Sequence, residues 1–318
     1  MRKSKIPNSL KIGIALGGGG ARGLTHIGVL RELEKNNFIP DLIAGTSVGA
    51  IIGAMYSATL DTHWVENRIK NFVNSDEFKI IGLNRINSKT EDDYSFLQMA
   101  TEFVKKTIQI NIVNERLGLL KSDRLKDALR YLLPVRKFSD LKLPFSCSSV
   151  DLHTGNDIIF KDGNLLDAVL ASSAIPGYIQ PIKYKDMLLT DGGVSRPIPA
   201  QMVIDNGSEF TIGVSADIQK FNPINNLNLI QILGRTEQIT TKKLSKFNNK
   251  ILDVFLEPDT LNLFWGDFSK IDVLIKNGEN TVIDNLEMIQ HAYKKKTRFI
   301  NKIQKIFQNT KPKMESNN

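Results

Sequence analysis

Short apolar runs alternate with amphipathic stretches near the start of the chain. Residues 11–16 form an apolar run that ends in glycines, and residues 42–45 form a second short run of the same kind. Residues 22–36 carry apolar side chains at helical spacing, and the pattern at residues 48–58 predicts a buried helix. The order strand, loop, helix, strand, turn, helix is typical of an α/β fold with a mainly parallel sheet.

The middle and the end of the chain carry weaker patterns. Residues 61–131 are less hydrophobic and predict mostly helix, with Ser122 as a cap and Pro134 as the stop of the last one. Phe96, Met99, Phe103 and Ile110 repeat at helical spacing within this stretch. The later patterns predict strands at 145–150, 157–160, 187–190, 209–214 and 251–256, and helices at 165–172, 229–246 and 281–307.

A G-x-S-x-G element occupies residues 45–49, between a predicted strand and a predicted helix. This context is the one in which a nucleophile elbow forms: flanking glycines allow a sharp turn that exposes the hydroxyl of Ser47. The plainer alternative is a glycine-rich turn with an incidental serine. The five residues alone leave both interpretations open.

A serine nucleophile needs a base, because its hydroxyl barely reacts at neutral pH. The four histidines, His26, His63, His153 and His291, have positions that poorly fit a Ser-His-Asp triad. Asp191 ends a predicted strand, where α/β sheets assemble their sites, and a desolvated carboxylate there could accept the serine proton directly. Taken alone, the D-G-G sequence at 191–193 is equally a common turn.

Four consecutive glycines, Gly17 to Gly20, separate the first strand from the first helix. Such a loop exposes backbone N–H groups toward an anion, and acyl transfer needs these donors for its tetrahedral oxyanion. Arg22 places a cation at a helix N-terminus, which opposes the helix dipole. A nearby negative charge, on a reaction intermediate or a phosphate, would offset that cost.

The same loop supports a remote alternative, a dinucleotide-binding protein. Gly18, Gly20 and Gly23 fit G-x-G-x-x-G in the strand-loop-helix context that this fingerprint requires. Asp41 has nearly the spacing of the ribose-binding acid, but it precedes the second strand instead of following it. The sequence therefore fits a dinucleotide site poorly.

Four ordered blocks closely resemble those of patatin-like phospholipases, and the match is similar to compact bacterial members. The blocks are GGGARG at 18–23, GTSVG at 45–49, ASSAIP at 171–176 and DGG at 191–193. This resemblance implies a three-layer α/β/α sandwich and metal-independent, cofactor-free hydrolysis of phospholipid or lysophospholipid acyl esters. It also implies Ser47 as nucleophile, Asp191 as proton acceptor, an oxyanion hole from Gly18, Gly19 and Gly20 with help from Arg22, and structural roles for Ser172 and Ser173.

The resemblance gives a domain division. Residues 9–217 form the expected catalytic domain, in which 61–140 are a mostly helical insertion. Residues 218–310 are expected to form a C-terminal extension packed on it, and 311–318 a disordered tail. An acyltransferase or thioesterase that uses the same serine is a second class of enzyme compatible with these residues.

The charge pattern concerns partners and location. The formal net charge is +8, without the zinc, RNA-binding or heptad-linked basic motifs that would favour nucleic acid. No signal peptide or transmembrane helix is predicted, and the one cysteine, Cys147, fits a cytoplasmic location. The basic helix at 281–307 has two interpretations: a packed helix with a solvated basic face, or peripheral docking on anionic membrane that delivers substrate to Ser47.

Overall fold

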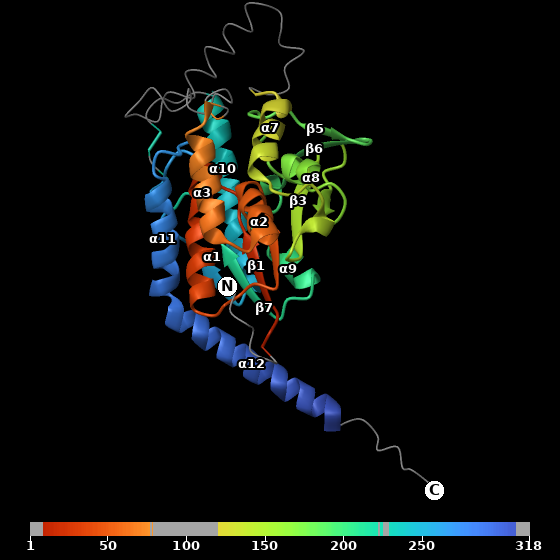
Figure 1. Cartoon of the computed structure of the whole chain (residues 1–318), viewed down its shortest axis with the longest axis vertical. Helices are drawn as coiled ribbons and strands as arrows, with labels where there is room; N and C mark the ends of the chain where they lie inside the picture. Colours follow the sequence, from red (N-terminus) through yellow and green to blue (C-terminus); the bar gives the residue numbers. More distant parts are fainter. Residues whose placement is uncertain (1–8, 77, 79–119, 222, 225–228, 310–318) are drawn as a thin grey trace, which may run out of the picture.

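A computed structural model describes residues 9–76, 78, 120–221, 223–224 and 229–309 of the chain (Figure 1). The described part contains one mixed, mainly parallel sheet with strand order β5-β6-β3-β2-β1-β7-β8, and β4 pairs with β3 beside this path. The strands are β1 (Ile12–Leu16), β2 (Leu42–Gly45), β3 (Phe145–Asp151), β4 (Asp157–Phe160), β5 (Ile182–Tyr184), β6 (Met187–Asp191), β7 (Phe210–Val214) and β8 (Val254–Leu256).

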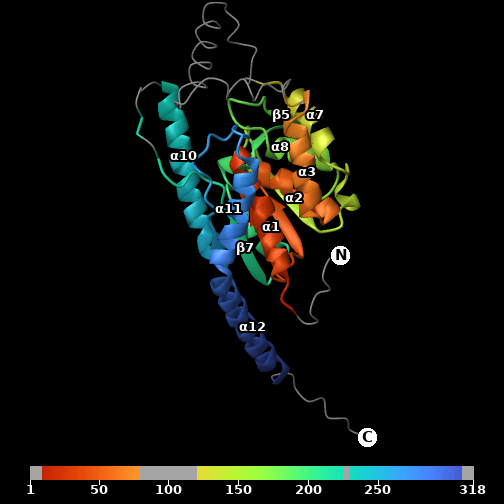
Figure 2. The same cartoon turned by 60° about the vertical axis from the view of Figure 1, so that its left-hand side comes forward.

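Helices cover both faces of this sheet, which makes the fold an α/β/α sandwich (Figures 1 and 2). The longer helices are α1 (Thr25–Lys35), α2 (Val48–Thr59), α3 (Thr62–Val73), α7 (Ser122–Leu132), α8 (Leu165–Ser172), α9 (Ala200–Asp205), α10 (Leu229–Asn248), α11 (Ile271–Asp284) and α12 (Leu286–Asn309). Short 3-10 turns are η1 (Gly20–Leu24), η2 (Phe138–Asp140), η3 (Gly192–Val194) and η4 (Asn249–Ile251). The α/β fold class predicted from the sequence is confirmed.

The alternation of side chains along the strands divides the core between the two faces. Ile14 and Ile43 join the larger cluster under α1, α2, α3, α7, α8 and α11. Ala15 and Ala44 belong to the smaller cluster, with Met202 of α9. Small residues on this second face let α9 approach the sheet closely.

The residues after 217 are integral to the same sheet and its cover. β8 pairs in parallel with β7 and forms the last strand of the order. α11 lies against α1 at two glycines: a carbon added at Gly28 would lie 1.9 Å from the Ile275 carbonyl oxygen, and one added at Gly278 2.0 Å from the Thr25 carbonyl oxygen. The two helices therefore touch backbone to backbone.

The largest difference from the sequence prediction concerns the helix expected at 281–307. The chain forms two helices instead, because Asn285, with φ −107° and ψ 9°, ends α11 before α12 begins. The turn lets α11 follow α1 while α12 leaves in a new direction, as both views show (Figures 1 and 2). Apolar periodicity continues through the turn, so the pattern alone did not reveal the break.

Smaller differences concern boundaries. The helix expected from residue 22 begins as η1 and becomes α1 only at Thr25, and the strand expected at 251–256 is shortened by η4. Ser122 is the first helical residue of α7, and Lys121, whose side chain makes no capping bond, takes the cap position. The helical repeat of Phe96, Met99, Phe103 and Ile110 and the expected tail at 311–318 lie outside the described residues.

α12 packs against the amino ends of the strands. The Tyr293 ring meets Phe38 and Phe210 with centroids 5.7 and 5.1 Å apart, and its hydroxyl accepts a hydrogen bond from the Leu10 amide at 2.9 Å. Lys296 pairs with Asp253, just before β8, at 2.8 Å. None of the helices in the described part of the chain combines the length and apolar composition of a bilayer span.

We predict that Gly278→Ala destabilises the protein. The added carbon would lie 2.0 Å from the Thr25 carbonyl oxygen, so α11 must move away from α1. Overpacking of this kind lowers the free energy of unfolding by about 1–3 kcal/mol, which chemical or thermal unfolding would measure.

Gly234→Ala in α10 is the matched control, because a carbon added there meets nothing within 4 Å. Alanine favours a helix over glycine by about 0.5–1 kcal/mol, so this control is expected to be neutral or slightly stabilising. A Gly278→Ala protein as stable as the parent would contradict the backbone contact.

Candidate active site

Ser47 occupies a sharp turn between β2 and α2. Its backbone has φ 55° and ψ −124°, a region that costs a non-glycine residue energy, and its side chain is buried. The turn requires glycine at positions 45 and 49. A Cβ atom added at Gly45 would lie 2.4 Å from the Gly49 carbonyl oxygen, and one added at Gly49 would lie 2.2 Å from the Leu16 carbonyl oxygen. The local geometry is that of a nucleophile elbow.

Two neighbouring serines at the end of α8 hold the strained turn from both sides. Ser172 Oγ accepts a hydrogen bond from the Ser47 amide at 3.2 Å, and Ser173 Oγ donates to the Ser47 carbonyl at 3.4 Å. Both side chains are buried. These structural serines thus act directly on the backbone of the nucleophile, which the sequence did not indicate.

Strand pairing brings Asp191 to Ser47 across a long sequence separation. On β3, Cys147 pairs with Gly45 of β2, and Ser149 pairs with Asp191 of β6. β4 pairs with the opposite edge of β3, from Cys147 to Val150. β2 and β6 therefore share one edge of β3 and end facing each other on either side of Ser148. Thr46 Oγ1 lies 3.2 Å from Ser148 Oγ, at the centre of this meeting point.

Asp191 is buried and hydrogen-bonded at this point. Its Oδ1 accepts the Gly193 amide at 2.7 Å, and the Ser47 hydroxyl lies close enough to lower the pKa of its carboxyl. Burial raises the pKa of Asp191 to about 7, against the interactions with Ser47 and Gly193, which lower it, and with a smaller rise caused by Glu237. A carboxyl with a pKa near neutrality, in contact with a serine hydroxyl, is suited to general-base work.

The glycine loop lies beside the elbow, but its amides differ in availability. The Gly18 amide donates to the Pro197 carbonyl at 3.0 Å, so it is already engaged. A carbon added at Gly18 would lie 3.3 Å from Ser47 Cβ, so this glycine keeps the loop close to the nucleophile. Among the described residues, the amides of Gly19, Gly20 and Val48 show no hydrogen-bond partner.

The Gly19 and Gly20 backbones adopt conformations that suit glycine. Their φ angles are +153° and +59°, and an added carbon would lie 2.5 Å from the Ala216 oxygen or 2.2 Å from the Trp265 oxygen. The loop is therefore held rigidly by segments from two distant parts of the sequence. Val48, whose amide opens α2, is a donor candidate that the sequence prediction did not name.

Arg22 is partly buried next to this loop. Its Nε donates to the Gly19 carbonyl at 3.0 Å, which pins the loop to η1. Burial lowers the pKa of the Arg22 guanidinium, and the charges of Asp217 and Glu237 partly offset that effect. Two carboxylates of the chain itself, Asp217 and Glu237, thus act on the Arg22 charge, whereas the sequence pointed to an intermediate or a phosphate.

The four histidines lie apart from the dyad. His26 is buried and its Nε2 is 2.8 Å from the Gly17 carbonyl oxygen; burial lowers the pKa of His26 to about 4, so the ring is neutral. His63, His153 and His291 are exposed. Among the described residues, no histidine contacts Ser47 or Asp191.

Asp41 does not fit the dinucleotide alternative. Its carboxylate accepts the Ile12 amide at 2.6 Å, at the amino end of β1. The glycine loop lies at the other end of that strand, so Asp41 cannot reach a ribose bound there. This observation removes the acid that the fingerprint needs.

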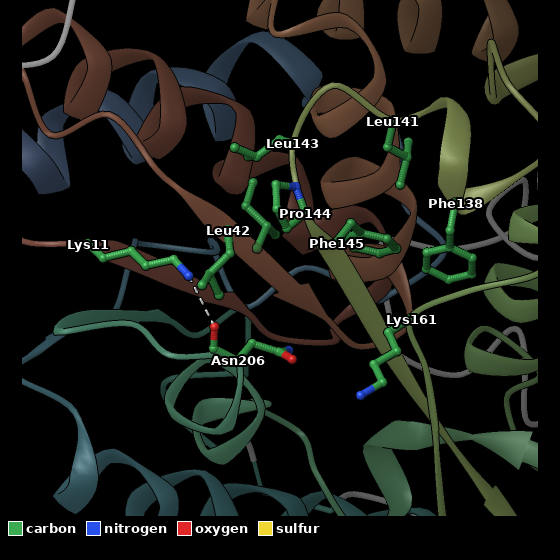
Figure 3. Close-up of a pocket in the computed structure, with 10 residues that line it drawn as sticks. Lys11, Leu42, Phe138, Leu141, Leu143, Pro144, Phe145, Lys161 and Asn206 are labelled. Carbon is green, nitrogen blue, oxygen red and sulfur yellow. Dashed lines mark hydrogen bonds between the residues drawn. The ribbon is translucent and has the colours of Figure 1, made fainter.

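A surface hollow of about 390 Å³ also lies at the amino ends of the strands, away from the dyad (Figure 3). Leu42, Pro144 and Phe145 face it, with Lys11 and Lys161 at its sides. Leu42 and Phe145 begin β2 and β3, whose carboxyl ends carry the elbow. The hollow therefore belongs to the opposite edge of the sheet from Ser47.

Within the described residues, no cluster of His, Cys, Asp or Glu side chains could hold a metal ion.

Comparisons with known proteins agree with the motifs. An uncharacterized NTE family protein of Mycobacterium tuberculosis is 28% identical over 219 residues, 68% of this chain and 52% of that protein. Lysophospholipase NTE1 of Meyerozyma guilliermondii is 23% identical over 303 residues, 87% of this chain and 19% of that protein. The chain thus spans about half the length of the mycobacterial relative and less of the yeast one.

Two solved structures share low similarity with the chain. VipD from Legionella pneumophila covers 89% of this chain and 68% of its own, with 12% identity and a TM-score of 0.41. ExoU from the ExoU-SpcU complex of Pseudomonas aeruginosa covers 90% and 52%, with 14% identity and a TM-score of 0.40.

A family model, by contrast, covers more than half of the chain. The patatin-like phospholipase model matches residues 14–204, which contain the glycine loop, the elbow and Asp191. The chain belongs to the patatin-like phospholipase family, a family of lipid ester hydrolases.

Proposed function

We propose that the chain hydrolyses the carboxylic esters of phospholipids or lysophospholipids through a Ser47–Asp191 dyad and an acyl-enzyme. The observation that carries this proposal is the meeting of Ser47 with the buried Asp191 where β2 and β6 share one edge of β3, together with burial that raises the pKa of that carboxyl to about 7. A carboxylate of ordinary pKa would be a much weaker base toward a serine proton.

In the acylation step, Asp191 takes the Ser47 proton while Oγ attacks the ester carbonyl carbon. The carbonyl oxygen becomes an oxyanion that the amides of Gly19, Gly20 and Val48 stabilise, and removal of one such donor costs about 3–4 kcal/mol in related chemistry. The carbon–oxygen bond to the leaving alcohol then breaks. Asp191 returns its proton to that alcohol, and the acyl group stays on Ser47.

In the deacylation step, water takes the place of the alcohol. Asp191 removes a proton from the water, and the resulting hydroxyl attacks the acyl carbon through the same oxyanion hole. The bond to Ser47 Oγ breaks, Oγ regains the proton from Asp191, and a fatty acid leaves. Neither step requires histidine, a metal or a redox cofactor.

The lipid class of the substrate rests on relatives and on charge. The yeast relative carries the name lysophospholipase over a match that includes 87% of this chain. Arg22 contributes a cation beside the glycine loop, which suits the oxyanion or a lipid phosphate. Both features favour an ester next to a phosphate over a neutral ester.

Ser47→Ala and Asp191→Asn are each expected to lower kcat at least about 10⁴-fold on a soluble ester, with little further loss in the double variant. The physical reason is that base and nucleophile act as one unit. A fluorophosphonate probe should label the parent and fail to label Ser47→Ala.

Ser139→Ala and Asp205→Asn are the matched controls, because both residues are exposed and lie outside the site. Each control should keep full activity and labelling. Parent-like turnover in Asp191→Asn would rule out the dyad.

The pH profile follows from the state of Asp191. Only the ionised carboxylate can accept the Ser47 proton, and the pKa of Asp191 is about 7. The kcat/KM for a soluble ester should therefore rise about tenfold per pH unit below that value and level off above it. Initial rates across this range measure the apparent pKa, and a flat profile from weakly acid to neutral pH would exclude Asp191 as the base.

Asp191→Asn is also expected to be more stable than the parent at neutral and higher pH. The folded-state pKa is raised to about 7 from 3.8, so stability that is present below pH 3.8 is lost as the pH rises through 7. Asparagine avoids that loss. The melting temperature of Asp191→Asn should exceed that of the parent at pH 7 and above, and the two should converge near pH 4. Equal melting temperatures throughout would show that burial does not penalise the carboxylate.

A further inference from the structure

Helix α10 is amphipathic, yet it leaves three large apolar side chains in the open. Ile232, Leu233 and Phe247 are 40%, 58% and 68% exposed. Ser245 is the only buried side chain among those of α10 that the structure describes. A helix in a folded protein normally gains most of its stability by burying its apolar face, but no residue in the described part of the chain covers these three side chains.

The exposed residues lie on one side of the helix. Positions 232, 236, 240, 243 and 247 follow each other at intervals of three or four, which places them on one face, and position 233 adjoins it. We call this face the α10 stripe; it consists of Ile232, Leu233, Thr236, Thr240, Lys243 and Phe247, all exposed.

The polar side of α10 faces the protein body instead. Asn248 Nδ2 donates to the Ile198 carbonyl at 3.4 Å, and Lys242 Nζ donates to the Ile218 carbonyl at 2.9 Å. Polar groups thus make hydrogen bonds on the side where a surface helix normally packs apolar side chains, although Ile239 and Leu244 are also half-buried.

Cations border the stripe. Arg235 and Lys242 lie over the Phe221 ring, 5.2 and 5.5 Å from its centroid. Lys246 is exposed one turn further along, and Glu237 is the one acidic residue in the part of α10 whose side chains are described. An apolar face with a basic border is complementary to an anionic lipid surface.

The position of α10 connects the stripe to the catalytic edge. Lys242 of α10 donates to the carbonyls of Ile218 and Gln219, which follow the carboxyl end of β7, and Ala216 of the same segment lies against Gly19 of the glycine loop. The helix therefore lies at the edge of the sheet that carries Ser47 and Asp191. α12, which carries the C-terminal lysines, lies at the other end of the sheet, by the starts of β1, β7 and β8 (Figure 2).

We propose that the α10 stripe inserts into the surface of a membrane or lipid aggregate that carries anionic headgroups, with the helix axis in the plane of the surface. The inference rests on the proposed function for its substrate class. In this orientation Ile232, Leu233 and Phe247 enter the boundary between headgroups and acyl chains, and the exposed Lys243 and Lys246 meet lipid phosphates. The α10 side of the dyad then faces the lipid.

The test uses full-length Ser47→Ala protein, which leaves the lipid intact, and sedimentation with vesicles of phosphatidylcholine, with and without phosphatidylglycerol. Binding should increase with phosphatidylglycerol and decrease with salt. Adding Leu233→Ser and Phe247→Ser should weaken binding about tenfold or more, because two large apolar contacts are lost. The same two changes in active protein should leave hydrolysis of a small soluble ester unchanged.

Two variants serve as matched controls. Val273→Ser with Ile283→Ser removes a comparably exposed apolar pair, 44% and 47% exposed, from α11. Glutamine at Lys294, Lys295 and Arg298 removes charge from α12. Both should bind vesicles like the parent.

Three results would overturn the proposal. One is unchanged vesicle binding by the α10 double variant, and another is weaker binding by the α12 variant alone. The third is a lower melting temperature or a change in oligomeric state of the α10 variant without a change in vesicle binding, which would assign the stripe to another part of the chain or to a second copy. Because vesicle binding needs no turnover, failure of the dyad would leave this result readable.

Discussion

The carboxyl ends of β2 and β6 meet along one edge of β3, and the catalytic site depends on this pairing. β2 pairs in parallel with β3 as far as Cys147. β6 pairs with β3 in the antiparallel direction, along the β3 residues Asp151 to Ser149. Side chains along a strand alternate between faces, so a slip of one residue in β6 would turn Asp191 away from Ser47. The antiparallel strands, which depart from a purely parallel α/β sheet, position the proposed base.

This pairing also explains why the surroundings are built as they are. Placing a carboxyl group beside a serine away from water costs stability, as the raised pKa of Asp191 shows. The positive φ of Ser47 costs more. Ser172, Ser173 and the Gly193 amide offset part of these costs with hydrogen bonds made inside the core.

The sequence contained enough to predict the sharp turn at Ser47 and to name Asp191 as a candidate base. Gly45 and Gly49 are needed by local geometry, and Asp191 ends a strand that its own pattern reveals, so the residues that meet could be named without the fold. The sequence could not show which loop amides are free to bind an oxyanion. The Gly18 amide, for example, donates to the carbonyl of Pro197, which lies far along the chain. Local sequence does not specify which distant carbonyl reaches an exposed amide.

The helices after residue 217 show a second limit of sequence patterns. An apolar stripe predicts that a helix is amphipathic, but it does not say toward which side the stripe points. In α11 the close approach at Gly278 gives a contact with α1 that periodicity cannot display. In α10 the stripe points outward, because the side that meets the body is held by polar bonds from Lys242 and Asn248.

The location of positive charge therefore matters more than its amount. Lys294, Lys295 and Arg298 make α12 the most obviously basic helix by sequence, but Tyr293 anchors that helix at the amino ends of the strands. A membrane bound there would lie at the opposite edge of the sheet from Ser47, and substrate delivery by α12 has no route in this architecture. α10 exposes fewer cations, among them Lys243 and Lys246, but it packs on the segment that follows β7 and lies against the glycine loop. For an enzyme that takes substrate from a lipid surface, the shorter path from headgroup to nucleophile favours the α10 side.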